Sequence, residues 1–199
     1  MQFEQLSSDI EQLLRQKERV VVAIDGMSAA GKSSFAKQSS MLLASQITKN
    51  IIHMDHFFLR PGQRTSERLS MPGGNIDYER FIEEVAKPLA SGEPFSYRPF
   101  NCKTQDFDEP VAVEPKPLTI IEGVYSMHPE IAEACLFDIS IFMQIDEDEQ
   151  HRRLKERNPQ LYQRFLEEWI PMESMYFDAY DIAEKCTYIC NDSLWRKNE

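Results

Sequence analysis

The feature that most constrains this chain is a glycine-rich octapeptide at residues 26–33, Gly26-Met27-Ser28-Ala29-Ala30-Gly31-Lys32-Ser33. It matches the pattern G-x-x-x-x-G-K-[S/T] at every fixed position. A chance match in a chain of 199 residues has a probability on the order of one in a hundred. The two glycines permit backbone conformations in which successive N–H groups surround a phosphate. Lys32 would supply a positive charge to the β- and γ-phosphates, and the Ser33 hydroxyl would bind Mg²⁺.

The motif lies between a predicted strand and a predicted helix. Residues 20–24 (Val-Val-Val-Ala-Ile) are a continuous apolar run, which predicts a buried parallel strand. Residues 33–45 predict a helix with Phe35, Leu42 and Leu43 on its inner face. The positive end of the helix dipole would add to the attraction for phosphate. We therefore interpret the segment as an ATP-binding P-loop, with contacts from Gly26, Met27, Ser28, Ala29, Ala30, Gly31, Lys32, Ser33 and Ser34.

The whole chain alternates short apolar runs with longer helical periods, which is typical of an α/β fold. We expect a three-layer P-loop kinase fold with a doubly wound, mainly parallel five-stranded sheet and a helical lid. In such sheets ligands bind at the carboxyl ends of the strands. The predicted strands are 20–24, 51–54, 118–121, 137–145 and 186–190. The predicted helices are 3–17, 33–45, 78–90 (which Pro88 should end early), 147–156 and 160–178.

We expect a single domain over residues 1–199, because this length and 42% hydrophobic residues suffice for one core. Residues 1–19 would carry an N-terminal helix, 58–76 a substrate-side loop, and 150–178 the lid and the helix after it. The four cysteines lack paired C-x-x-C spacing, which favours buried thiols over a zinc site. Cys186 and Cys190 would face the same side of the last strand.

The composition argues against several classes of partner. Asp and Glu (33) outnumber Lys and Arg (22), so the formal net charge of −11 repels nucleic acids and anionic lipids. No apolar run approaches the roughly 20 residues that span a bilayer. The charged N-terminal segment (Glu4, Asp9, Glu11) lacks the apolar region of a signal peptide. We expect a cytoplasmic protein that acts on a small molecule, with no nucleic-acid or membrane partner; a homodimer is one of the oligomeric states left open.

Two carboxylates follow strands that should border the P-loop strand. Asp55 comes after the strand at 51–54, where it could accept the proton of an attacking hydroxyl or bind a water of Mg²⁺. Glu122 ends the strand at 118–121, where an acidic residue normally supports the metal. The alternative is that each is an exposed acid at the start of a loop. Together with Lys32 and Ser33, they indicate a site for a metal and phosphate.

The predicted helix at 147–156 and the residue after it carry three arginines. Arg153 and Arg157 are four residues apart and share a face. We predict that this face closes over the phosphates, with Arg153 in a catalytic role and Arg157 bound to ATP. The alternative is a solvated helix on which Arg152 and its neighbours pair with Glu147, Glu149 and Glu156.

These motifs resemble those of the uridine kinase family of P-loop small-molecule kinases, which includes nicotinamide riboside kinases. The resemblance covers most of the chain after residue 19. It rests on the P-loop, on Met-Asp-His-Phe-Phe at 54–58, on Ile-Ile-Glu-Gly at 120–123 and on the stretch from Arg153 to Arg157. That stretch is followed by Trp169, Pro171, Met172 and Tyr176, as in the lids of these kinases.

The resemblance implies roles for individual residues. Asp55 would be the catalytic base for a ribose hydroxyl, and Glu122 would support metal or substrate. Asp77 would hold sugar hydroxyls, and Tyr97 would pack on the base. The chain departs from uridine kinases at Cys102, which stands where they have a histidine that reads the pyrimidine. The resemblance therefore predicts phosphoryl transfer but not pyrimidine specificity.

The leading hypothesis is an ATP-dependent phosphotransferase that moves the γ-phosphate to a hydroxyl of a nucleoside or sugar-like small molecule. One alternative is a nucleoside monophosphate kinase, in which Arg60, Arg64, Arg68 and Arg98 would bind the acceptor phosphate. Another is a nucleotide-dependent switch or partner-binding NTPase without an acceptor pocket. For the leading hypothesis we place Asp77, Tyr97, Arg98, Glu122 and Arg64 at the acceptor, with ATP and Mg²⁺ as cofactors.

Overall fold

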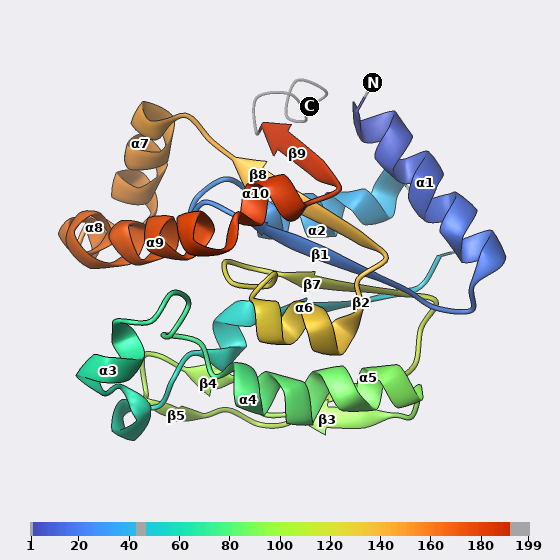
Figure 1. Ribbon diagram of the computed structural model, residues 1–199, viewed down its shortest axis with the longest axis horizontal. Coiled ribbons are helices and arrows are strands. Elements are labelled where there is room, and N and C mark those ends of the chain that lie inside the picture. The colour runs from blue at the N-terminus through green and yellow to red at the C-terminus, as the bar shows by residue number, and fades with distance from the viewer. Residues whose placement is uncertain (1, 43–46, 192–199) are drawn as a thin grey trace.

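The computed structural model describes residues 2–42 and 47–191, and its centre is a parallel five-stranded sheet (Figure 1). The strand order is β2-β7-β1-β8-β9, and every neighbouring pair is parallel. This confirms the α/β class and the five predicted strands. The bounds are β1 Val20–Gly26, β2 Lys49–His53, β7 Leu118–Glu122, β8 Ile139–Gln144 and β9 Tyr188–Asn191.

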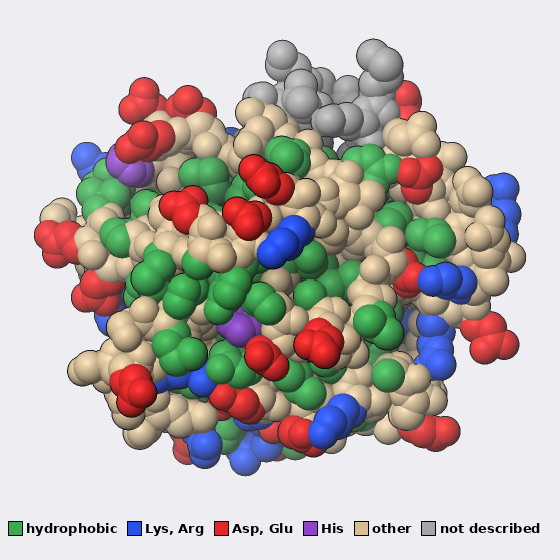
Figure 2. Space-filling view, viewed as in Figure 1, with side chains coloured by type: hydrophobic (Ala, Val, Ile, Leu, Met, Phe, Trp, Pro, Cys, Tyr) green, Lys and Arg blue, Asp and Glu red, His purple; other side chains and the backbone are tan. Residues whose placement is uncertain are grey.

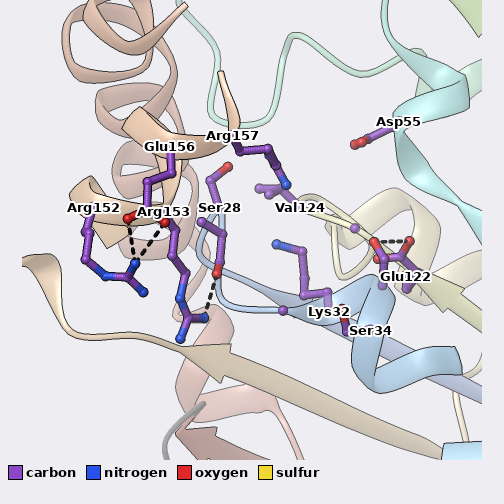
Figure 3. Close-up of a pocket in the computed structure, with 14 residues that line it drawn as sticks. Ser28, Lys32, Ser34, Asp55, Glu122, Val124, Arg152, Arg153, Glu156 and Arg157 are labelled. Carbon is purple, nitrogen blue, oxygen red and sulfur yellow. Dashed lines mark hydrogen bonds and ion pairs between the residues drawn. The ribbon is translucent and has the colours of Figure 1, made fainter. Parts of the chain in front are cut away.

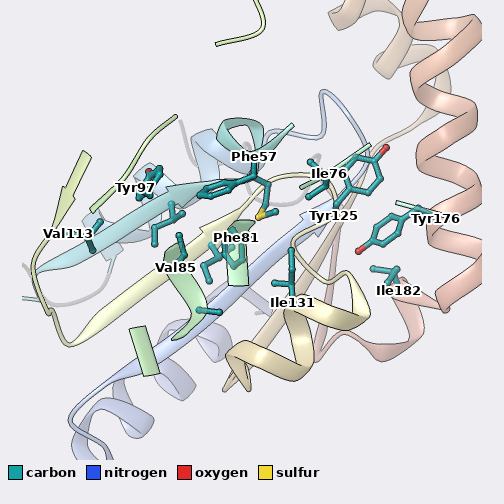
Figure 4. Packing of buried hydrophobic residues seen from close by; sticks show 14 of the residues in the cluster. Phe57, Ile76, Phe81, Val85, Tyr97, Val113, Tyr125, Ile131, Tyr176 and Ile182 are labelled. Carbon is teal, nitrogen blue, oxygen red and sulfur yellow. The ribbon is translucent and has the colours of Figure 1, made fainter. Parts of the chain in front are cut away.

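Helices cover both faces of the sheet, so the fold has three layers (Figure 1). On one face α1 (Gln2–Gln16) and α2 (Lys32–Leu42) bury Leu6, Ile10 and Phe35 against β1, β7 and β8. On the other face α6 (Pro129–Cys135) and the helical segments 78–91 and 162–180 close a second core (Figure 4). Burial of apolar side chains on both faces holds β1 rigid at the centre, which fixes where the P-loop begins.

Two helices continue through a proline, each by way of a π-helical turn. The first consists of α4 (Tyr78–Phe81), η3 (Ile82–Ala86) and α5 (Lys87–Ser91). The expectation that Pro88 ends it early is wrong: Lys87 N–H donates to Ile82 O, five residues back, and the helix ends only at Gly92. A wider turn accommodates the proline ring and its missing N–H. The second helix repeats this before Pro171, with α8 (Tyr162–Arg164), η4 (Phe165–Trp169) and α9 (Ile170–Tyr180).

Short elements flank the sheet and connect its strands. The segment after β2 winds through η1 (Met54–Phe57), η2 (Pro61–Gln63) and α3 (Ser66–Leu69). Two small antiparallel pairs follow: β3 (Phe95–Tyr97) with β6 (Val111–Val113), and β4 (Phe100–Asn101) with β5 (Asp106–Phe107). The chain then continues to α7 (Glu147–Arg157) and, after α9, to α10 (Ile182–Lys185). Acidic side chains gather over α7, α9 and α10 on the face in Figure 2.

Some predicted boundaries and orientations differ from the structure. The strand predicted at 51–54 ends at His53, and Met54 already belongs to η1. Cys186 lies before β9 rather than in it, and it packs on the opposite side of the sheet from Cys190. The prediction of one shared side is therefore wrong, because the chain still leaves α10 at Cys186. The predicted inward positions of Leu42 and Leu43 lie outside the described side chains.

Candidate active site

A cavity of about 550 Å³ lies at the carboxyl edge of the sheet (Figure 3). The parallel register sets β7 beside both β1 and β2, with Glu122 opposite Ile24 and His53. The cavity is lined by P-loop residues, by three carboxylates and by arginines of α7: Ser28, Ala29, Gly31, Lys32, Ser33, Ser34, Asp55, Glu122, Glu156, Arg152, Arg153 and Arg157 among them. The structure thus brings together most of the residues that the sequence assigned to ATP and metal.

The P-loop is folded tightly at its root. Gly26 has φ 129°, and a Cβ there would lie 2.0 Å from the Met143 carbonyl oxygen, so only glycine fits. Met27 N–H donates to that same oxygen at 2.9 Å. Ala30 is fully buried and belongs to the core under the loop. Within the predicted P-loop set, these residues therefore support the loop, whereas residues 28–29 and 31–34 face the cavity.

Lys32 is folded back in this structure. Its side chain is 8% exposed, and Nζ donates to the carbonyl oxygens of Gly26 at 2.7 Å and Met27 at 2.9 Å. Lys32 is therefore buried rather than exposed in the loop. The positive charge of Lys32 contributes to the lowered pKa of Glu122 and opposes the rise in the pKa of Asp55. Loop carbonyls and neighbouring carboxylates thus hold the ammonium group at the cavity wall.

Glu122 connects the P-loop to β2. Ser33 Oγ donates to Glu122 Oε1 at 2.9 Å, and His53 Nδ1 pairs with the same oxygen. Burial alone would raise the pKa of Glu122, but the hydrogen bonds from His53 and Ser33 and the charge of Lys32 lower it overall. A hydroxyl and an ionised carboxylate side by side are the oxygen ligands that Mg²⁺ prefers. The donor set therefore fits Mg²⁺ carried by a nucleotide.

Asp55 lies in η1 and reaches the cavity from the side opposite Lys32 (Figure 3). Its side chain is open to solvent in the cleft. Partial enclosure by protein and the negative charge of Glu122 raise its pKa, while Lys32, His53 and Arg157 act in the opposite direction. A carboxylate whose pKa is raised is a better proton acceptor.

A second cavity of about 530 Å³ adjoins the first, and the two share Ser28, Asp55, Val124 and Arg157. Its other walls are mostly aromatic and apolar: Phe58, Pro99, Phe100, Tyr125, Phe165 and Trp169. Polar groups also reach it, namely His56, Asn75, Asn101, Cys102, Lys103, Asp108 and Glu173. Asp55 and Arg157 therefore stand where the two cavities meet. Such an arrangement can bring a bound phosphate and a second molecule to the same carboxylate.

The three arginines of α7 have different surroundings. Arg152 is exposed and paired with Glu149 and Glu156, as the solvated-helix alternative predicts. Arg153 pairs with Glu149 and also donates to the Ala29 carbonyl oxygen at 3.2 Å, so it contacts the P-loop. Arg157 lines both cavities.

Comparison with known proteins shows which family this chain belongs to. Residues 21–157 match the model of the Phosphoribulokinase / Uridine kinase family. The chain belongs to this family. It is 27% identical over 130 residues to the phosphoribulokinase of Synechocystis sp. (strain ATCC 27184 / PCC 6803 / Kazusa), and the match covers 65% of this chain. The match spans 39% of that relative's length.

Solved structures share the fold. The "putative fructose transport system kinase" from Silicibacter sp. TM1040 superposes with a TM-score of 0.73 at 20% identity, over 96% of this chain and 99% of that one. The "Possible Uridine Kinase" from Bacillus stearothermophilus gives 0.66 at 20% identity, over 93% and 98%. Family and fold together support an ATP-dependent small-molecule kinase. No helix within residues 2–42 and 47–191 has the length and apolarity needed to cross a bilayer.

None of the four remaining residues of the predicted acceptor set lines the second cavity, although Tyr97, Arg64 and Arg98 contact residues that do. Asp77 is buried and caps α4, accepting from Arg80 N–H at 3.1 Å and from Gln63 Nε2 at 2.9 Å. The Tyr97 hydroxyl lies 3.2 Å from His56 Nδ1. Arg64 donates to Leu59 O, and Arg98 donates to the carbonyl oxygens of Phe107 and Asp108. Their roles toward an acceptor stay predictions.

Sequence reasoning missed two buried carboxylates that contact the P-loop region. Asp25 is fully buried in β1 and accepts hydrogen bonds from Met127 N–H at 2.8 Å and from Tyr176 Oη at 2.8 Å. Glu173 accepts from both the N–H and the hydroxyl of Ser28. The only local signal was Asp25 itself, an acidic residue between the apolar run at 20–24 and Gly26.

Proposed function

We propose that this member of the family is an ATP-dependent kinase that transfers the γ-phosphate to a hydroxyl of a nucleoside or sugar-like molecule. The observation that carries the proposal is the junction of the two cavities at Asp55. ATP would occupy the cavity at the P-loop, and the acceptor would occupy the cavity with aromatic walls. A switch NTPase has no need of the second cavity.

In the proposed reaction the acceptor oxygen attacks the γ-phosphorus in line. The new bond joins that oxygen to phosphorus, the bond to the bridging oxygen of ADP breaks, and the hydroxyl proton passes to Asp55. Lys32 and Arg157 would stabilise the charge on the phosphate oxygens. Ser33 and Glu122 would hold Mg²⁺, which neutralises phosphate charge when it is bound. We further propose that the chain is a single domain in which 150–178 holds a lid and the helix after it, and that closure of the lid would exclude water.

The walls of the second cavity favour an acceptor with a flat ring. Phe100, Phe165 and Trp169 present aromatic surface, while Asn101 and Asp108 supply groups for hydrogen bonds. A second candidate is an acceptor that carries a phosphate, because three guanidinium groups gather around the ring of Phe107. Those of Arg60, Arg80 and Arg98 lie 5.7, 5.1 and 5.2 Å from the centre of the Phe107 ring.

A panel assay tests the proposal. ADP formation from ATP–Mg²⁺ would be measured with nucleosides, ribosides, sugars, and the monophosphates of each. We expect at least one unphosphorylated nucleoside or sugar-like compound to raise ADP formation well above the rate without acceptor. Stimulation by nucleoside monophosphates alone would favour the monophosphate kinase, and stimulation by no small molecule would contradict the proposal.

Substituting Glu122 with glutamine should raise the Mg²⁺ concentration that gives half-maximal activity. The variant keeps the shape of the side chain but removes the charge that faces Ser33 and His53. We expect an increase of about tenfold, as for other groups that tune a metal site. A Mg²⁺ titration at saturating ATP measures it, with exposed Glu130→Gln on α6 as the matched control. An unchanged midpoint would assign Glu122 a purely structural role.

A further inference from the structure

The P-loop contacts the helical segment 162–180 at two points, one helical turn apart. At the root of the loop, Tyr176 donates to Asp25, the residue before Gly26. At the tip, both oxygens of Glu173 accept from Ser28: Oε2 from its N–H at 3.0 Å, and Oε1 from its hydroxyl. Glu173 is 5% exposed, so it is largely shielded from competing water. The two side chains lie three residues apart and therefore share a face of α9.

The tip is also held from α7. Gln150, which is 2% exposed, donates through Nε2 to the Ser28 carbonyl oxygen at 2.9 Å. Arg153 donates to the carbonyl oxygen of Ala29 at 3.2 Å. Side chains from two helices thus bind both polar groups of the Ser28 backbone and the peptide after it.

The residue next to Ser28 explains why these hydrogen bonds to the tip of the loop are useful. Ala29 has φ 63°, a left-handed conformation that costs a residue with a Cβ about 1–2 kcal/mol. Strained backbone of this kind persists only when surrounding contacts hold it in place. Peptides 28 and 29 line the ATP cavity, so their orientation decides where the loop N–H groups point.

We infer that Glu173 is a positioning residue, which sets the phosphate-binding conformation of the P-loop by accepting the two hydrogen bonds of Ser28. The inference rests on the proposed function, because it takes the loop to bind the phosphates of ATP. Glu173 also lines the second cavity, on the same helical segment as Phe165 and Trp169. It therefore contacts the ATP side and the acceptor side of the site at once.

The test compares two substitutions of Glu173. Alanine removes both acceptors, whereas glutamine can still accept from Ser28 N–H and donate to the hydroxyl. We expect ATP–Mg²⁺ binding, measured by calorimetry without acceptor, to weaken about 10- to 100-fold in Glu173→Ala, the range for a lost charge-assisted hydrogen bond. Glu173→Gln should stay within about threefold of the parent. Exposed Asp178→Ala on α9 is the matched control and should not change the affinity.

A second readout needs no nucleotide. Amide hydrogen exchange of residues 28–31 should accelerate in Glu173→Ala and remain near the parent rate in Glu173→Gln. In turnover, the loss in Glu173→Ala should fall on KM for ATP more than on KM for the acceptor. If alanine prevents folding, Glu173→Met, which fills a similar volume without an acceptor, should give the same losses.

Two results would overturn the inference: an unchanged ATP affinity and exchange rate in Glu173→Ala, or equal losses in the alanine and glutamine variants. The second result would mean that the charge, not the hydrogen bonds, matters. Parent protein that binds ATP but phosphorylates no acceptor would contradict the proposed function alone. The two failures can therefore be told apart.

Discussion

Replacing Asp55 with asparagine should reduce phosphoryl transfer to the acceptor at least about 100-fold, because general base catalysis contributes roughly 100- to 10,000-fold. Asparagine keeps the shape of the side chain and some hydrogen bonding, but it cannot accept the hydroxyl proton. Asp55 lies at the junction of the two cavities, opposite Lys32 and beside Arg157. The loss should therefore appear in kcat, and binding of ATP–Mg²⁺ should stay similar.

The matched control is Asp108→Asn, which removes a carboxylate from the second cavity away from the junction. This variant should change KM for the acceptor more than kcat. Transfer by Asp55→Asn at the parent rate would remove Asp55 from catalysis. The P-loop would then belong to a protein whose reaction is unexplained.

Replacing Lys32 with alanine should lower ATP turnover by roughly 100- to 1,000-fold, the cost of removing one preorganised charge from a transition state. In this structure the ammonium group donates to the carbonyl oxygens of Gly26 and Met27, which leaves its third N–H for a phosphate. The fold should persist, because β1 and α2 are held by the apolar core beneath the loop.

Turnover and circular dichroism of the Lys32 variant would be measured together. Lys155→Ala is the control, since it removes an exposed lysine from α7. Near-parent turnover in a Lys32→Ala protein with an unchanged spectrum would contradict the assigned role. Loss of the spectrum would mean that the buried ammonium group also supports the loop.

Local patterns predicted the frame of the site correctly. The apolar runs gave all five strands, since β-branched segments between helices are typical of parallel sheets. In a parallel sheet the carboxyl ends meet at one edge, which is why the sequence predicts Asp55 and Glu122 beside the P-loop, where both line the cavity. Helical spacing predicted that Arg153 and Arg157 share a face of α7, and both line the cavity.

Long-range contacts could not be predicted in this way. Tyr176 and Asp25 form a hydrogen bond although 151 residues separate them, and Glu173 and Ser28 do so across 145 residues. No local pattern in the sequence indicates either pair. The continuation of the helix through Pro88 depends on a π turn that its packing against the second core favours. The folded-back position of Lys32 depends on loop carbonyls whose direction only the folded backbone sets.

The acceptor side was the least predictable part of the site. Its walls come from the small β4–β5 pair, from η1 and from η4, which are far apart in sequence. The role of Asp77 as a sugar ligand came from resemblance alone. In the structure its carboxylate accepts hydrogen bonds from Arg80 N–H and Gln63 Nε2, and these support the loop around α3 and η2. A role in the acceptor site needs its own test.

The most direct test of the central claim is the identity of the bond that the enzyme makes. Phosphorus NMR of a reaction with ATP–Mg²⁺ and the best acceptor of the panel would follow the γ-phosphate to its product. The account predicts a phosphate ester on a carbon-bound hydroxyl, formed in equal amount with ADP, and formed at least about 100-fold more slowly by Asp55→Asn. Transfer of the γ-phosphate to water alone, seen as inorganic phosphate formed together with ADP, would contradict it, as would a new diphosphate linkage on a phosphorylated acceptor.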